Sequence, residues 1–422
     1  MKQFLIIGNS AAGIAAVEAI RRRDKDSRIT VISEEDYPSY CRCMISYFLA
    51  GEVQEEKIIY RPQEFYRKNN IELLLNKKVI RVDPKKNRVV CEDKSQISYD
   101  ALLIATGARP KFPEIEGIKK NGVFGLRTIK DAKEISGLVP VTKTACVLGG
   151  GLIGLKAAYA LKKRNIEVNV IIKSRQALSQ MLDAESAGLL QNRLQEHGVE
   201  VILGQDVIEV IGEEGELKAV KLDSGKAIGC SLIIVGKGVS PNIDLIKDSG
   251  IKFNEGIIAD NHLTTNIPNI YTAGDAAETF DLTLGAQSIN ALWPVAVEQG
   301  KICGANMAGE ALIYDGSLGM NSIEFFGLAV VSLGVYRIKD GDSSFEELKL
   351  SDAKRNVYRK IILKNNIPLG AVLVGDIRNS GVFLRLIREK VDVSSVKDKL
   401  LEENFGFPAI KDLVKDKEQI YV

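Results

Sequence analysis

Residues 144–154 have the sequence Thr-Ala-Cys-Val-Leu-Gly-Gly-Gly-Leu-Ile-Gly, an apolar run that ends in a cluster of glycines. We expect a strand over 145–148, a helix over 155–164 and a second strand over 167–172. Glycines in a tight turn between a strand and a helix let backbone N–H groups approach a pyrophosphate at the helix N-terminus. This stretch therefore predicts a complete dinucleotide-binding βαβ unit. Its expected contacts come from Gly149, Gly151, Leu152, Ile153 and Gly154.

The second strand of this unit ends in positive charge. An acid at this position would bind the ribose of NAD, whereas Lys173 and Arg175 stand here. Basic residues suit the 2′-phosphate of NADP. Ordinary solvated charge at a strand end accounts for the same residues, so both interpretations stay open.

A similar but weaker pattern begins the chain. A strand over residues 2–7 leads into the turn Gly8-Asn9-Ser10-Ala11-Ala12-Gly13, followed by a helix over 14–23 and a strand over 28–33. Ser10 replaces the usual second glycine but is small enough for a phosphate to come close. Glu34 follows the second strand, where an acid accepts a hydrogen bond from a ribose hydroxyl. Two such units predict two bound dinucleotides, or one internal duplication of the unit whose two copies serve different purposes.

A third candidate element lies far along the chain, at residues 264–275. A short apolar strand ends in Gly274-Asp275, which places a carboxylate at the carboxyl edge of a sheet. Asp275 is the candidate for contact with a cofactor hydroxyl, and a helix N-cap is the alternative role. Pro294 lies at the start of a helix expected over 295–307, whose N-terminus is able to face an anionic ring edge.

Composition narrows the class of protein. The chain has 422 residues, 45% of them hydrophobic and 27% charged, which is typical of a soluble multi-domain protein. A net charge of +2 implies no nucleic-acid partner. No apolar run approaches the roughly 20 residues of a membrane span, and the first strand leaves no room for a signal peptide. With only two histidines we expect no metal site, and six scattered cysteines indicate a reducing cytoplasm.

Together these motifs resemble the FAD-dependent pyridine nucleotide-disulfide oxidoreductases over about residues 1–310. The resemblance rests on GNSAAG at 8–13, Glu34, ATGARP at 105–110, GGGLIG at 149–154 and NIYTAGD at 269–275. It implies an α/β fold with two Rossmann-like domains, the second inserted into the first, and a C-terminal α+β interface domain. The implied segments are an FAD-binding part over 1–110, an NAD(P)H-binding domain over 111–237, a second FAD-binding part over 238–310 and the interface domain over 311–422.

The resemblance also implies the residues that bind FAD and NAD(P)H. Beyond the second glycine turn, the expected cofactor-binding residues are Gly8, Ser10, Ala11, Ala12, Gly13, Glu34, Arg42, Val79, Thr106, Gly107, Arg109, Lys173, Arg175, Gly238, Gly274, Asp275 and Pro294.

Two thiols flank one arginine in the stretch Tyr40-Cys41-Arg42-Cys43-Met44-Ile45-Ser46. An apolar run follows, so we expect a helix to begin here; a thiolate is favoured by the arginine and by the helix dipole. Two buried small hydrophobic side chains are the plainer alternative.

Two branches of the family share features with this stretch. It is similar to the segment that carries the single redox cysteine of coenzyme A-disulfide reductases and NADH oxidases, with Cys43 at the redox position. It also resembles the Tyr-x-Arg-Pro-x-Leu-Ser segment of ferredoxin and rubredoxin reductases, which have no redox cysteine. Three departures from the family pattern are Ala11 in place of the peroxidase histidine, Lys156 in place of an acid, and Ser46-Tyr47 in place of a proline-containing continuation.

The sequence therefore predicts a cytoplasmic enzyme that takes hydride from NAD(P)H onto FAD. In the leading hypothesis Cys43, with Cys41 and Arg42, passes the electrons to a small disulfide, persulfide or polysulfide. In the alternative the chain is an electron-transfer component that docks a small iron–sulfur carrier. A flavoprotein that only senses redox state is disfavoured, because it has no need of a nicotinamide site. We expect a homodimer, with no nucleic-acid and no membrane partner.

Overall fold

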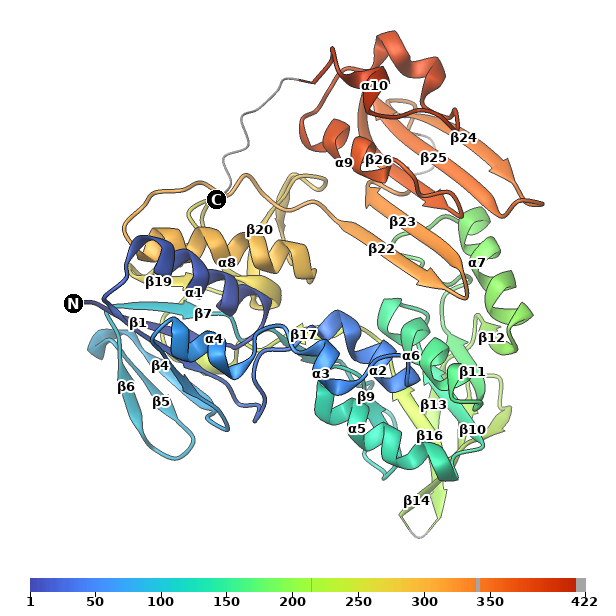
Figure 1. Ribbon diagram of the computed structural model, residues 1–422. Helices are drawn as coiled ribbons and strands as arrows, with labels where there is room; N and C mark the ends of the chain where they lie inside the picture. Colours follow the sequence, from blue (N-terminus) through green and yellow to red (C-terminus); the bar gives the residue numbers. More distant parts are fainter. Residues whose placement is uncertain (214, 339–341, 415–422) are drawn as a thin grey trace.

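The structure is a computed structural model that describes residues 1–213, 215–338 and 342–414. Three lobes are visible in Figure 1. The first contains the N-terminus and the yellow and orange segment around α8, the second is the green lobe below and to the right, and the third is the orange and red sheet domain above it.

Five parallel strands form the sheet of the first lobe, in the order β19-β7-β1-β2-β3. The edge strand β19 returns from far along the chain, since Ile270 pairs with Leu102 of β7. The second lobe is therefore inserted into the first, as the resemblance implies. The strands are β1 (Gln3–Ile7), β2 (Arg28–Ile32), β3 (Ile71–Leu74), β7 (Ala101–Ile104) and β19 (Ile270–Thr272).

Two helices, α1 (Ala11–Arg23) and α8 (Trp293–Met307), pack side by side on one face of this sheet (Figure 1). Their backbones touch, because a Cβ on Gly300 or Gly304 would lie 2.2 or 2.3 Å from a carbonyl oxygen of α1. The opposite face is covered by a small antiparallel sheet and by residues 245–251. The strands of that small sheet are β4 (Val79–Asp83), β5 (Arg88–Cys91) and β6 (Gln96–Ser98).

The second lobe repeats this architecture with a second parallel sheet, in the order β12-β11-β10-β16-β9. Helices cover one face and an antiparallel meander covers the other. The sheet strands are β9 (Val123–Gly125), β10 (Thr144–Leu148), β11 (Glu167–Ile172), β12 (Val199–Leu203) and β16 (Leu232–Val235). The helices are α5 (Ile129–Leu138), α6 (Leu152–Lys163) and α7 (Ala184–Glu196), and the meander consists of β13 (Val207–Glu213), β14 (Glu216–Leu222) and β15 (Ala227–Gly229).

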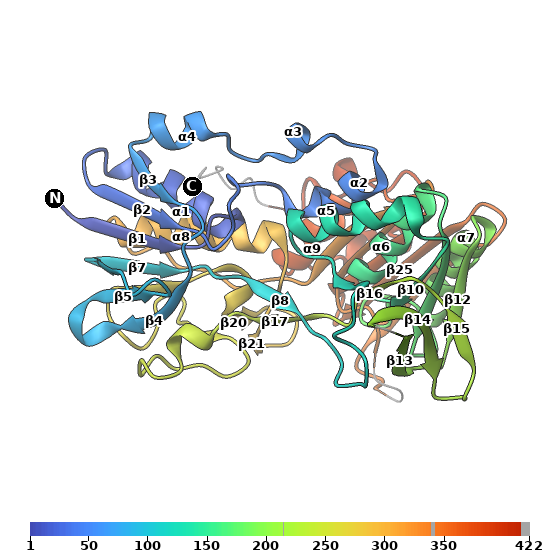
Figure 2. The same ribbon diagram turned by 90° about the horizontal axis from the view of Figure 1, so that it is seen from below.

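Two short strands connect the first two lobes. β8 (Ala108–Pro110) and β17 (Val239–Pro241) pair antiparallel, so the outgoing and returning crossings run side by side. The stretch with the two cysteines makes a second link, because α2 (Ile45–Ala50) belongs to the first segment of the chain but packs on α5 and α6 of the inserted lobe (Figure 2). The exact domain boundaries stay a prediction.

The third lobe is an antiparallel sheet in the order β22-β23-β26-β25-β24, with α9 packed against it. It contacts the inserted lobe through α7, where Asp183 binds Tyr358 and Lys360 of the sheet. The elements are β22 (Met320–Phe325), β23 (Leu328–Gly334), β24 (Glu346–Asp352), β25 (Val357–Lys364), β26 (Ile367–Val374), α9 (Ser380–Arg388) and α10 (Phe407–Ile410).

The remaining short elements of the first lobe are α3 (Glu55–Ile58), α4 (Gln63–Lys68), β18 (Ile257–Ile258), β20 (Ala277–Asp281) and β21 (Ala286–Ser288). Several observed ends differ from the predicted ones. The first helix begins at Ala11 rather than at residue 14, and the helix of the second unit begins at Leu152 rather than at 155. In the third lobe the sequence also predicts a helix over 396–402, where the structure has a 3₁₀ segment, Ser394–Lys399.

No helix in the described ranges is long and apolar enough to cross a membrane. The same residues contain no group of three or more His, Cys, Asp or Glu side chains arranged to hold a metal ion.

Candidate functional site

The first glycine turn joins β1 to α1 and leaves no room for side chains at its two glycines. Gly8 has a φ of +121°, and a Cβ there would lie 2.0 Å from the carbonyl oxygen of Ala105. A Cβ on Gly13 would lie 1.9 Å from the oxygen of Gly8. Ser10 occupies the N-cap without a side-chain cap bond, so the free N–H groups of the first turn of α1 are left for another acceptor. This geometry is that of a pyrophosphate-binding turn.

The second turn, between β10 and α6, repeats this geometry. Gly149 has a φ of +112°, and a Cβ on Gly154 would lie 2.2 Å from the oxygen of Gly149. At Gly151, the N-cap of α6, the nearest atom to an added Cβ is 3.8 Å away within the described residues. The space in front of this helix N-terminus is therefore open to a ligand.

Asp275 forms an ion pair with a residue that the sequence did not single out. The Nη2 atom of Arg127 donates to Asp275 Oδ2 at 2.5 Å, and both side chains are mostly buried. Arg127 follows β9, between the two lobes, and its Nη2 also lies beside Gly107. Asp275 caps no helix among the described residues, since the segment after it continues into β20. The N-cap role is thus wrong.

Arg42 is held between the two lobes. Its Nη2 forms an ion pair with Glu35, and its Nη1 donates to the backbone oxygen of Arg127 at 2.9 Å. Tyr40 donates its hydroxyl to the same Glu35, and the tyrosine oxygen accepts the N–H of Ile129 at 3.2 Å. Burial raises the pKa of Tyr40, so this hydroxyl remains a donor. The network fixes the backbone on both sides of the thiols.

The two thiols lie on a turn. Cys41 precedes the 3₁₀ segment Arg42–Met44, and α2 begins only at Ile45. Cys43 is exposed and Cys41 is half-buried, and no disulfide joins them. The hydrogen bond from Cys43, aided by the backbone N–H groups of Cys43 and Met44, lowers the pKa of Cys41 to about 6. The same interaction with Cys41 is the main cause that raises the pKa of Cys43. The thiolate of the pair therefore lies on Cys41, although the sequence had favoured Cys43.

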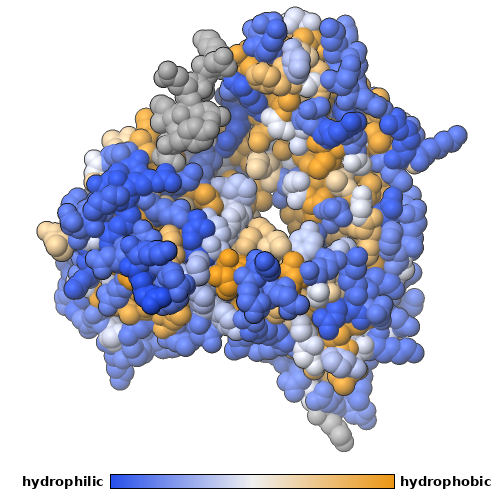
Figure 3. Space-filling view, in the orientation of Figure 1, coloured by the Kyte–Doolittle hydropathy of each residue, from blue (hydrophilic) through white to orange (hydrophobic). Residues whose placement is uncertain are grey.

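Cys43 lies within electrostatic range of the Arg127–Asp275 pair, because the charge of Arg127 lowers the pKa of its thiol and the charge of Asp275 raises it. The thiols, Arg42 and Asp275 thus form one site where the first two lobes meet. Figure 3 shows that the face of the molecule seen in Figure 1 is hollowed in the middle, between the lobes.

Other predicted residues lie around this site or on the surface. Gly238 and Ile153 line a small pocket together with Arg127, which connects the second glycine turn to the site. The Oγ1 atom of Thr106 donates to the backbone oxygen of Asn242 at 2.7 Å. Arg109 points to solvent and pairs with Asp244 at 2.8 Å.

Three predicted residues that follow two of the strands are exposed. Glu34 points outward, and it is the neighbouring Glu35 that faces Arg42. Lys173, with 79% of its side chain exposed, lies 3.5 Å from Asp206, and Arg175 is exposed as well. Val79 is half-buried in β4, and Pro294 lies in the first turn of α8.

Three buried polar atoms around the first glycine turn find no hydrogen-bond partner among the described residues: Asn9 Nδ2, Ser39 Oγ and Arg127 Nε. Ser39 and Asn9 are neighbours, because the hydroxyl of Tyr66 accepts the N–H of Ser39 and donates to Asn9 Oδ1. Buried polar groups are nearly always paired, so these atoms indicate a polar ligand here. A flavin dinucleotide with its phosphates and hydroxyls fits this set.

Lys156 is engaged elsewhere. Its Nζ donates to the hydroxyl of Tyr47 at 2.9 Å and to the backbone oxygen of Glu324 at 2.8 Å. It also lies 4.4 Å from the centre of the Tyr47 ring. This lysine therefore joins α6 to α2 and to the third lobe, and its ammonium group makes its contacts at the boundary between lobes.

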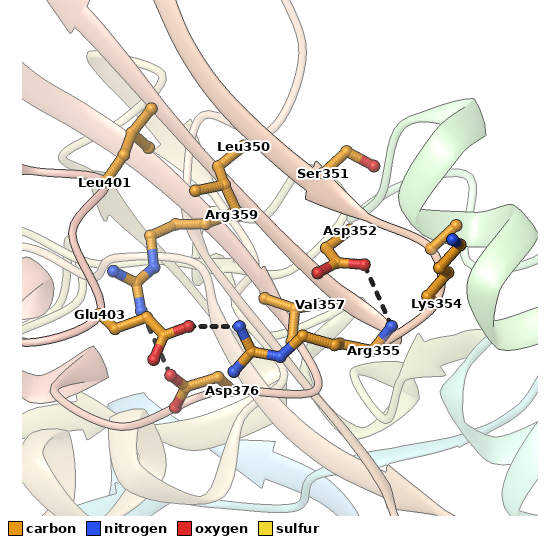
Figure 4. A pocket seen from close by; sticks show the side chains of 11 residues that line it. Leu350, Ser351, Asp352, Lys354, Arg355, Val357, Arg359, Asp376, Leu401 and Glu403 are labelled. Carbon is orange, nitrogen blue, oxygen red and sulfur yellow. Dashed lines mark hydrogen bonds and ion pairs between the residues drawn. The ribbon is translucent and has the colours of Figure 1, made fainter.

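One pocket lies away from the glycine turns. It is on the third lobe, with a volume of about 480 Å³, and its charged lining residues form ion pairs with one another (Figure 4). Arg355 pairs with Glu403 and Arg359 with Asp376. We assign the cofactor site to the glycine turns, because this pocket lacks their open helix N-termini.

Arg127, Glu35 and Asn9 were missed as site residues. Asn9 lies within the predicted turn, and Glu35 directly follows the predicted acid Glu34. The first glycine motif could therefore have identified both residues. Arg127 has no motif around it, and only the packing of the two lobes brings it to Asp275.

A family profile described as pyridine nucleotide-disulphide oxidoreductase matches residues 2–300, and one described as rubredoxin NAD⁺ reductase C-terminal domain matches residues 320–391. An NADH oxidase of Methanocaldococcus jannaschii is 38% identical over 320 residues, which are 74% of this chain and 71% of that protein. A nitrite reductase [NAD(P)H] of Bacillus subtilis is 33% identical over 93% of this chain, but the chain spans only about half (48%) of its length. The structure of an NAD-dependent persulfide reductase from A. fulgidus superimposes with a TM-score of 0.88 at 28% identity, over 94% of this chain and 78% of that one.

Proposed function

The chain belongs to the pyridine nucleotide-disulphide oxidoreductase family, and from this premise we propose that it uses FAD to pass electrons from NAD(P)H to a sulfur–sulfur bond at Cys43. FAD, when bound, accepts hydride from the nicotinamide and delivers electrons to a second acceptor. The protein residues supply binding, orientation and the acceptor thiol.

In this proposal the first glycine turn holds the pyrophosphate of FAD. The open N–H groups of α1 bind the phosphates, and the glycines leave space for them. Asp275 accepts from a flavin-chain hydroxyl, while Arg127 and Asn9 supply the donors that lack partners. Arg42 holds the thiol turn against this site.

The second glycine turn holds the pyrophosphate of NAD(P)H at the N-terminus of α6. Gly151 leaves the approach open, and Gly238 and Ile153 line the passage toward Arg127. Lys173 and Arg175 are free enough to turn toward a 2′-phosphate, since both are exposed.

One observation carries the acceptor assignment. Cys43 is an exposed thiol, two residues from a second thiol, on the turn that Arg42 ties to Arg127, and Arg127 in turn pairs with Asp275. Of the chain's six cysteines, the four outside this turn are buried. An accessible thiol at this place suits exchange with a disulfide, persulfide or polysulfide.

The test compares Cys43→Ala with wild type in NAD(P)H oxidation driven by coenzyme A disulfide, glutathione disulfide or polysulfide. We expect the variant to lose turnover by orders of magnitude while retaining FAD. Cys91→Ala, at a buried position of the small sheet, is the matched control and should keep its activity. Wild-type protein that reduces none of these acceptors contradicts the proposal.

A second candidate function is transfer of electrons to an iron–sulfur carrier protein. It is supported by the match of residues 320–391 to the C-terminal domain of rubredoxin NAD⁺ reductases. NAD(P)H-dependent reduction of rubredoxin or ferredoxin that survives in Cys43→Ala would favour this function. Loss of that reduction together with loss of disulfide turnover would favour the thiol.

A further inference from the structure

The turn that carries Cys41 and Cys43 is held at both ends and in its middle. The N–H of Cys41 donates to Ile58 at 2.7 Å, and the N–H of Met44 donates to Cys41 at 3.0 Å. The side chain of Arg42, between the thiols, is bound to Glu35 and to the backbone of Arg127. The thiols are consequently free to react while the backbone around them stays in place.

The shape of the turn suits a bond between the two sulfurs. Arg42 is in a helical turn, and helix geometry separates residues i and i+2 by about 5–6 Å between Cα atoms. This value falls within the roughly 4.4–6.8 Å that disulfides require. The two thiols are close enough for each to shift the pKa of the other.

We propose that Cys41 is the resolving thiol for Cys43, and that the acceptor reaction passes through a Cys41–Cys43 disulfide. This rests on the proposed function. The enzyme therefore carries both thiols of the exchange and needs no free thiol from solution. Exposure assigns the roles, because the exposed Cys43 can meet an acceptor and the half-buried Cys41 can meet Cys43.

The steps balance for a disulfide acceptor RSSR′. The reduced pair carries one proton, shared between Cys43 and the Cys41 thiolate. As the Cys43 sulfur attacks RSSR′, its proton passes to Cys41; a Cys43–SR bond forms and the S–SR′ bond breaks. The leaving R′S⁻ takes the proton from Cys41 and departs as R′SH. The Cys41 thiolate then attacks the Cys43 sulfur, which forms the Cys41–Cys43 disulfide and releases RS⁻.

Regeneration also balances. One hydride equivalent from NAD(P)H, delivered by way of FAD, supplies the two electrons and the one proton that convert the disulfide back to the singly protonated pair. The sum is RSSR′ plus NAD(P)H giving R′SH, RS⁻ and NAD(P)⁺.

The deciding experiment needs no turnover. Holoenzyme with its thiols reduced and its flavin oxidised is mixed with one equivalent of 5,5′-dithiobis(2-nitrobenzoate), a chromogenic disulfide, and the protein mass and released thionitrobenzoate are measured. For wild type we expect both halves of the probe to be released and a protein mass lower by two hydrogens. For Cys41→Ala we expect one half to remain on Cys43, and dithiothreitol or coenzyme A to remove it. Cys43→Ala should not form the internal disulfide, and Cys91→Ala should behave as wild type.

A turnover assay tests the resolving role of Cys41 separately from the proposed disulfide reductase function. Cys41→Ala should reduce the probe with NAD(P)H about tenfold or more slowly than wild type, and added thiol should restore the rate. Stable single adducts on wild type, or a Cys41→Ala variant with wild-type turnover in the absence of thiol, overturn the resolving role alone. Absence of any NAD(P)H-dependent disulfide reduction by wild type overturns the proposed function instead. FAD absorbance of each variant checks that it is folded.

Discussion

Arg127 of the inserted lobe and Asp275 of the first lobe form an ion pair, with 2.5 Å between Nη2 and Oδ2. The pair joins the end of β9 in the inserted lobe to the turn after β19 in the first lobe. It thus brings a residue of the inserted lobe to the site at which we place the flavin.

We expect the purified protein to be yellow, with one FAD per chain, and Asp275→Ala to bind FAD more weakly. A lost hydrogen bond to a charged group costs about 1.5–3 kcal/mol, or about 10- to 150-fold in the dissociation constant. Titration of the apoprotein with FAD, followed by flavin fluorescence, measures the change. Asp93→Ala removes an exposed ion pair of the small sheet and should leave binding unaltered. Equal affinity in wild type and Asp275→Ala would remove Asp275 from the site.

The pH dependence of alkylation tests the thiol pair. Because the pKa of Cys41 is lowered to about 6, chiefly by the hydrogen bond from Cys43, the thiolate is present above that pH. The rate of reaction with iodoacetamide should therefore rise through about pH 6 and then level off. In Cys43→Ala the donor is gone, and we expect the midpoint to move up toward an ordinary thiol value. Peptide mapping identifies the alkylated residue; a midpoint that stays near 6 in the variant would contradict the shared hydrogen bond.

Cofactor preference tests the positive charge at the end of β11. We expect NADPH to be preferred, and Lys173→Glu to raise the KM for NADPH about tenfold, or about 1.4 kcal/mol, with little change for NADH. Lys130→Glu is the matched control, because both side chains are 79% exposed. Steady-state kinetics with each donor decides the question. A preference for NADH that the substitution leaves unchanged would make Lys173 a solvated charge.

Stability tests the contact between the second and third lobes. Asp183 lies 2.5 Å from Lys360, whose side chain is only 3% exposed, and it also accepts from Tyr358. We expect Asp183→Asn to lower the free energy of unfolding by about 3 kcal/mol, because it leaves the buried ammonium of Lys360 with only the longer pair to Glu347 at 3.7 Å. Glu185→Gln, which breaks an exposed pair with Lys349 between the same lobes, should cost about 0–1 kcal/mol. Urea unfolding followed by circular dichroism measures both.

The ionisation of Asp183 also predicts how the stability of the protein falls at low pH. Burial alone would raise the pKa of Asp183, but hydrogen bonds from Lys360 and Tyr358 lower it to about 2. A carboxyl with a depressed native pKa contributes stability that is fully present above the ordinary value and is lost as the pH falls toward 2. Wild type should therefore lose more stability than Asp183→Asn between pH 5 and pH 2. Parallel losses in the two proteins would contradict this assignment.

The sequence predicted both parallel units because a strand followed by a glycine turn is a local signal. It placed the first residue of each helix three positions late, since Ala11 and Leu152 already belong to α1 and α6 while the glycine pattern still continues. A small residue inside a helix looks like part of a turn until its packing is known. The expected helix over 396–402 is a 3₁₀ segment that ends at Lys399, although its apolar residues Val396, Leu400 and Leu401 do pack in the core of the third lobe.

The site was predictable only in part. Asp275 and Cys43 stand in motifs, whereas Arg127 becomes a neighbour of Asp275 through the fold alone, 148 residues away. Which thiol ionises first depends on which cysteine stands at the N-cap of the turn, and in the structure this is Cys41. The spacing of two cysteines around one arginine does not predict which of them takes that position.

The position of β19 has a consequence for how the chain is made. β19 pairs with β7, and Ile270 lies opposite Leu102. During synthesis the edge of β7 stays open until the whole inserted lobe has left the ribosome, and an open strand edge invites pairing with other chains. The inserted lobe has a sheet made only of its own residues and can fold in that interval. The second sheet can therefore close before the first, and a nascent chain whose residues up to about 240 have left the ribosome can carry a complete second sheet while the first sheet still lacks its edge strand β19.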